Sequence, residues 1–116
     1  MTKREELFNL LAPYYRVPLD CDGQSNVFRR VLKDNGIKHK LMVGKVKSIE
    51  TGQVFPYHEW IEIGKWIIDF KARKWLGDHA SYGVFKRTKS NIEFFEVEDK
   101  SDRQIYSWEV LEVLLK

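Results

Sequence analysis

The sequence contains little cysteine and no long apolar run. Its single cysteine, Cys21, excludes an internal disulfide, and a free thiol is typical of a reducing compartment such as the cytoplasm. The N-terminal residues, Met1 to Glu6, are not followed by an unbroken apolar core, so no signal peptide is expected. The longest apolar runs are far too short to span a bilayer. We therefore expect a cytoplasmic protein with no membrane partner.

The chain also lacks a strong charge of either sign. Lys and Arg number 20 against 17 Asp and Glu, which gives a formal net charge of +3. Acidic residues are interleaved with the basic ones, so we interpret the charges mainly as solvated faces and do not expect nucleic-acid binding. The three histidines and the cysteine have no zinc-ligand spacing, and the glycines form no phosphate-binding loop. No metal or cofactor is expected, and the oligomeric state stays open.

What is present is the composition of a globular protein, 43% apolar and 32% charged, in a length of 116 residues that fits one domain over 1–116. Periodicity, caps and turn residues predict four helices and four strands. The helices are expected over about 2–13, 22–34, 72–76 and 107–115, and the strands over about 38–49, 54–63, 66–70 and 91–97. This pattern predicts an α+β fold in which a cysteine-bearing helix packs on an antiparallel sheet.

Cys21 stands at the start of the second predicted helix. A lone cysteine is more often a small buried hydrophobic residue than a nucleophile. Here, however, the helix dipole and the free N–H groups of the first turn can stabilise a thiolate and later an oxyanion. At about 100° per residue, Phe28 and Leu32 fall within about 20° of Cys21, so the thiol is expected to point at the sheet. Its neighbours are small and polar, which is less typical of a structural cysteine.

The hairpin with Gly64-Lys65 as its loop predicts which side chains share a face. Ile63 pairs with Trp66, Glu62 with Ile67, Ile61 with Ile68, and Trp60 with Asp69. Because side chains alternate along a strand, His58, Trp60 and Asp69 share one face, with His58 diagonal to Asp69. The other face is predicted to be the core face and carries Ile61, Ile63, Trp66, Ile68 and Phe70.

If the second helix covers the face of His58 and Asp69, these residues converge with Cys21 into a catalytic triad. His58 would take the thiol proton and Asp69 would orient His58. Taken singly, His58 is more often a backbone-bonded histidine than a base, and Asp69 is more often a turn or cap residue. Their shared face and the order Cys, His, Asp favour the catalytic interpretation.

Four segments resemble the transglutaminase-like superfamily of papain-like folds, which includes arylamine acetyltransferases and many small bacterial and phage proteins. They are Cys21-Asp22-Gly23-Gln24, Gly36-Ile37 to Val43-Gly44, His58-Glu59-Trp60-Ile61-Glu62, and Trp66-Ile67-Ile68-Asp69. The resemblance covers about residues 20–75. It implies that Cys21 is the nucleophile, His58 the base and Asp69 the orienting residue of a cysteine protease or amidase.

The chain departs from common members of that superfamily in its short His-to-Asp hairpin, its small size and the absence of a glutamine before Cys21. The missing oxyanion donor could be Tyr14, Tyr15, Gln24 or Ser25, and Trp60 is a further candidate for substrate binding. The small size favours an open site that acts on peptide or side-chain amide bonds of a protein substrate, ahead of acyl transfer and cross-linking. The alternative is a binding module or effector that keeps the fold and does no chemistry.

Overall fold

A computed structural model describes residues 2–15 and 21–114, without the side chains of Cys21 and Asp22. The chain has an α+β fold, as predicted. Its helices are α1 (Lys3–Leu11), α2 (Cys21–Asp34), α3 (Ala72–Leu76) and α4 (Trp108–Leu114), with 3-10 turns η1 (Ala12–Tyr14) and η2 (Arg87–Lys89). Its strands are β1 (Lys40–Ser48), β2 (Val54–Ile63), β3 (Trp66–Asp69), β4 (Gly83–Lys86) and β5 (Ile92–Asp99).

Local sequence signals explain where the first elements begin and end. The hydroxyl of Thr2 accepts a hydrogen bond from the backbone N–H of Glu5, which caps α1. Pro13 ends that helix and lies in the 3-10 turn that follows. The second helix begins at Cys21, within one residue of its predicted start, and reaches Asp34 as predicted.

The strands form one antiparallel sheet in the order β4-β3-β2-β1-β5. The predicted register of the β2–β3 hairpin is confirmed for three pairs, Ile63 with Trp66, Glu62 with Ile67 and Ile61 with Ile68. Strand β4 lies between residues 77 and 90, where the sequence patterns predicted no helix or strand, so they missed this strand. It is short and starts at Gly83, and a 3-10 turn follows it directly, so its periodic signal is weak.

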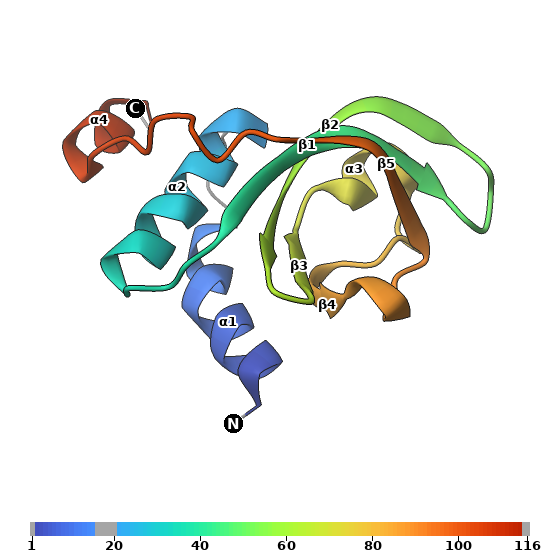
Figure 1. The fold of residues 1–116 in the computed structure, drawn as a ribbon, viewed down its shortest axis with the longest axis horizontal. Coiled ribbons are helices and arrows are strands. Elements are labelled where there is room, and N and C mark those ends of the chain that lie inside the picture. The colour runs from blue at the N-terminus through green and yellow to red at the C-terminus, as the bar shows by residue number, and fades with distance from the viewer. Residues whose placement is uncertain (1, 16–20, 115–116) are drawn as a thin grey trace.

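The sheet is strongly curved, and Figure 1 shows α3 on its inner side and α1 and α2 on its outer side. Gly44 contributes to this shape, because the register of β1 shifts next to Gly44 in its pairing with β2 and also in its pairing with β5. A Cβ at position 44 would lie 3.0 Å from the carbonyl oxygen of Phe95, so only glycine allows β5 to approach this closely. Such irregularities increase the bend of a strand.

Two apolar clusters occupy the two sides of the sheet. On the outer side, Phe28 and Leu32 of α2 pack with Ile61, Ile68 and Phe70, together with residues of α1. Ile61, Ile68 and Phe70 were predicted to form a core face, and all three are buried. Two further members of that face, Ile63 and Trp66, are partly buried against the same cluster. On the inner side the cluster consists of Val46, Trp60, Ile67, Ala72, Leu76, Ala80, Phe85 and Ile92.

One prediction about this packing was wrong. Helix α2 covers the face of Ile61 and Ile68, not the face that carries Trp60 and Ile67. The hairpin alone could not decide this, because the curved sheet is buried on both sides and each side carries large apolar residues. The first turn of α2 nevertheless lies near the end of β3, where Asp69 ends the strand.

We expect Ile68→Ala to lower the free energy of unfolding by about 2–5 kcal/mol, because it leaves a cavity between α2 and the sheet. Chemical denaturation followed by tryptophan fluorescence measures this loss. Cys21→Ser is the comparison variant and is expected to fold normally. If Cys21→Ser unfolds the protein while Ile68→Ala does not, the assignment of Ile68 to the core is wrong.

Candidate active site

A buried pair of polar side chains joins β2 to the end of β3. His58 Nε2 lies 2.7 Å from Asp69 Oδ2, and the two side chains are 0% and 1% exposed. The diagonal placement of these residues in the hairpin predicted this contact. Since burying polar groups is favourable only when they are paired, the contact is a strong local constraint on both side chains.

The second oxygen of Asp69 holds the chain that follows β3. Asp69 Oδ1 accepts hydrogen bonds from the backbone N–H groups of Lys71 and Ala72, each at 3.0 Å. These bonds satisfy donors at the start of α3, as an N-terminal cap does. The carboxylate is therefore fixed from both sides, by a histidine and by two amides, and its orientation is set by the backbone.

The contact with Asp69 also sets the protonation pattern of His58. An ionised carboxylate only accepts hydrogen bonds, so Nε2 carries the proton in this pair. In the neutral ring Nδ1 is then the nitrogen with a lone pair, and it is the atom that can take a proton from a donor. This is the tautomer that a general base needs when an acid orients it from the far side.

The start of α2 lies close to one member of this pair, Asp69. Gln24 and Ser25 line a cavity of about 10 Å³ together with Trp60, Asp69 and Phe70. Both α2 residues are buried. Cys21 opens the same helical turn, as predicted, and its side chain lies outside what the structure describes. The backbone therefore brings the start of the cysteine-bearing helix to the end of the strand that carries Asp69.

The four candidate oxyanion donors, Tyr14, Tyr15, Gln24 and Ser25, differ in where their side chains lie relative to this cavity. Gln24 and Ser25 lie at the cavity, and Gln24 Nε2 donates to the backbone oxygen of Tyr15 at 2.9 Å. The ring of Tyr15 stacks on Phe70 with 5.4 Å between centroids. Tyr14 instead packs against Trp108, 5.9 Å away between centroids. Gln24 and Ser25 are therefore better placed than the two tyrosines to serve a reaction at the first turn of α2.

Trp60, the other substrate-binding candidate, is buried and contributes to packing. Its ring centroid lies 6.2 Å from that of His58 and 4.5 Å from that of Phe94. Its indole N–H donates to Glu62 Oε2 at 2.9 Å, so the ring is fixed at both ends. Trp60 forms one wall of the environment of His58, and within the described surroundings it offers no face to a substrate.

Sequence reasoning missed a second buried charge next to the cavity. Glu59 lines the cavity with a side chain that is 2% exposed, and its Oε1 accepts from Arg103 Nη1 at 3.3 Å. A signal was present, since the alternation of β2 places Glu59 on the same face as the buried Ile61. Arg103 lies 44 positions further along, and the sequence alone gives no indication of that partner.

Within residues 2–15 and 21–114, no group of three or more His, Cys, Asp or Glu side chains could hold a metal ion. No helix in that part of the chain is long and apolar enough to cross a membrane. Comparison of the chain with models of known families, with characterised proteins and with solved structures gives no match.

Proposed function

We propose that this chain is a cysteine-dependent hydrolase of the transglutaminase-like kind, with Cys21 as nucleophile, His58 as base and Asp69 as orienting residue. The observation that carries the proposal is the buried 2.7 Å contact between His58 and Asp69. Asp69 in turn lines a cavity with Gln24 and Ser25 of α2, the helix that begins with the only cysteine of the sequence. A histidine oriented by a carboxylate, beside a helix N-terminus with a thiol, is the arrangement that thiol catalysis requires.

The proposed reaction breaks an amide bond in two steps. His58 Nδ1 takes the proton of the Cys21 thiol, and the sulfur attacks the carbonyl carbon to form a tetrahedral intermediate. The intermediate collapses to a thioester as His58 protonates the leaving nitrogen, which departs as an amine. A water molecule, deprotonated by His58, then attacks the thioester and releases the acid and the thiol.

We assign the supporting roles in this reaction as part of the same proposal. The first N–H groups of α2 point along the helix axis toward its start and can hold the oxyanion, with Gln24 or Ser25 adding a side-chain donor. Asp69 stabilises the imidazolium that forms in each step. We favour peptide or side-chain amide cleavage over transfer of the acyl group to an amine, because the chain is small.

A second function is favoured by one observation, the complete burial of His58 and Asp69. A buried pair that bonds β2 to β3 and to the start of α3 can also be purely structural. In that case the chain would be a protein-binding module, with an ordinary thiol at Cys21.

Mass spectrometry of a synthetic peptide library, incubated with the wild type or with Cys21→Ala, tests the proposal. We expect the wild type to produce changes that Cys21→Ala does not. Backbone cleavage gives fragments, side-chain amide hydrolysis adds about one dalton, and acyl transfer leaves the acyl group on an acceptor amine. If the two proteins leave the library in the same state, the hydrolase proposal is replaced by the binding module.

A further inference from the structure

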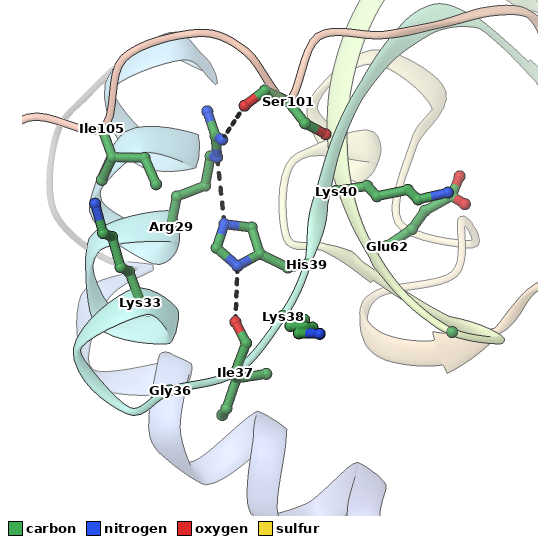
Figure 2. Close-up of a pocket in the computed structure, with 11 residues that line it drawn as sticks. Arg29, Lys33, Gly36, Ile37, Lys38, His39, Lys40, Glu62, Ser101 and Ile105 are labelled. Atoms are coloured by element: carbon green, nitrogen blue, oxygen red, sulfur yellow. Dashed lines mark hydrogen bonds between the residues drawn. The ribbon is translucent and has the colours of Figure 1, made fainter.

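A groove with a volume of about 710 Å³ lies along the C-terminal half of α2, away from the start of that helix. Its walls come from α2, from the segment that leads into β1, and from the chain after β5. Figure 2 shows Lys33 and Ile105 on one side of the groove and Lys38 and Lys40 on the other. Segments more than 60 positions apart in the sequence thus form one surface.

The groove carries an excess of positive charge. Lys33, Lys38 and Lys40 line it with exposed side chains, and none of them forms a salt bridge with another described residue. Among the described lining residues, Glu62 is the one acidic residue, and it forms an ion pair with Arg87. Carboxylates oppose two of these charges in part, since Lys40 lies opposite Glu62 in the sheet and near Asp99, and Lys33 lies near Asp34. The described lining nevertheless holds four cations, Arg29 included, against one carboxylate, so the groove is positive on balance.

A fourth cation, Arg29, is built into the wall. Its side chain is buried and donates to the backbone oxygen of Ser101 at 2.8 Å and to His39 Nε2 at 3.3 Å (Figure 2). It also donates to the backbone oxygen of Arg103 at 3.0 Å. Its partners are therefore neutral acceptors. Burial is the main cause that lowers the pKa of Arg29, and the negative charge of Asp99 opposes this only in part.

The neighbouring histidine, His39, carries no charge of its own. His39 accepts from Arg29 through Nε2, so its Nδ1 carries the proton and donates to the oxygen of Ile37 at 3.0 Å. Burial lowers the pKa of His39, which keeps the ring neutral at pH 7. The wall is thus rigid, hydrogen-bonded and positive, which is the environment that an anionic ligand requires.

The remaining lining distinguishes between anionic ligands. Ile37 and Ile105 are half-buried and provide an apolar surface between the lysines. Single-stranded nucleic acid is commonly held by aromatic rings that stack on bases, and no Phe, Tyr or Trp is among the described residues that line this groove. A peptide that combines carboxylates with an apolar side chain matches both features.

We propose that this groove binds an acidic peptide segment that carries at least one apolar side chain, as an exosite for a protein substrate. The link to a substrate rests on the proposed hydrolase function, whereas the binding itself does not. Lys33 stands twelve residues after Cys21 in the same helix, about 18 Å along its axis at 1.5 Å per residue. An extended peptide covers that distance in about five or six residues, so the acidic segment is expected at that separation from the bond that is cleaved.

Fluorescence polarisation with the Cys21→Ala protein tests the groove independently of catalysis. The probe is a fluorescein-labelled peptide of glutamate and leucine, compared with the same peptide in which glutamine replaces glutamate and with a labelled oligothymidylate. We expect saturable binding of the acidic peptide, weakened about tenfold by the double substitution Lys33→Gln with Lys38→Gln. The matched control, Lys3→Gln with Lys89→Gln, removes the same charge from exposed positions outside the groove and should leave binding unchanged.

The proposal is overturned if the two double variants bind the acidic peptide equally, if the glutamine peptide binds as tightly, or if oligothymidylate binds more tightly than either peptide. The result is separable from that for the hydrolase. Peptide binding with an inert Cys21 would support the groove and reject the hydrolase. Activity on the library without peptide binding would do the reverse.

Discussion

Replacing Asp69 by alanine is expected to lower the free energy of unfolding by about 3–5 kcal/mol, because it removes one partner of a buried polar pair. The carboxylate makes three contacts, one with His58 Nε2 and two with the backbone N–H groups of Lys71 and Ala72. Alanine leaves His58 Nε2 and the N–H of Ala72, both buried, and the partly buried N–H of Lys71 without this acceptor. We expect the variant to destabilise both the start of α3 and the β2–β3 hairpin, because Asp69 bonds to each of them.

Asp69→Asn is the matched control that separates stability from chemistry. Its side-chain oxygen can still accept from Lys71 and Ala72, so we expect a smaller loss of about 1–2 kcal/mol. Its amide faces His58 Nε2 as a donor, which shifts the proton of the ring to Nδ1 and removes the base. The asparagine variant should therefore fold but lose activity at least about a hundredfold. Denaturation curves and peptide turnover measure the two effects, and equal stability of the alanine variant and the wild type would refute the structural role of Asp69.

Substitution of His58 is expected to slow the reaction of Cys21 with iodoacetamide at pH 6.5 by about ten- to hundredfold. A thiol beside an imidazolium ionises well below its free pKa of about 8.5, and only the thiolate reacts. His58→Gln keeps most of the side-chain volume in a site that has no exposure, so it is preferred to His58→Ala. Because Cys21 is the only cysteine, intact-mass analysis reports this one site.

Alkylation of the same variant at pH 9.5 provides the control for access to the thiol. There the thiol is largely ionised with or without a histidine, so the rates of wild type and His58→Gln should converge. A variant that reacts slowly at both pH values has a blocked or rearranged thiol. Equal rates at pH 6.5 would show that His58 does not contact Cys21, and the binding-module alternative would then stand.

Much of the candidate site could be predicted from local sequence patterns. The two-residue loop at Gly64-Lys65 fixed the register of the hairpin, and the register placed His58 diagonal to Asp69. The start of α2 at Cys21 followed from the polar residues before a strong apolar stripe. Both inferences rest on geometry that a few neighbouring residues determine.

Features that depend on distant segments could not be predicted in this way. The side of the sheet that α2 covers could not be predicted, because both sides carry large buried apolar residues. The pairing of Glu59 with Arg103, and of Arg29 with Ser101, joins positions that no local pattern relates. The basic groove was interpreted from sequence as part of the solvated surface, because its lysines acquire a common orientation only in the folded chain.

The pH dependence of the alkylation of Cys21 in the wild-type protein tests the central claim most directly. We predict a rate that is already high near pH 6, with an inflection well below the free thiol value of about 8.5, because His58 and the start of α2 stabilise the thiolate. The same inflection should move upward in His58→Gln. A single inflection near 8.5 in both proteins would contradict the account, since it would show a cysteine that neither the histidine nor the helix activates.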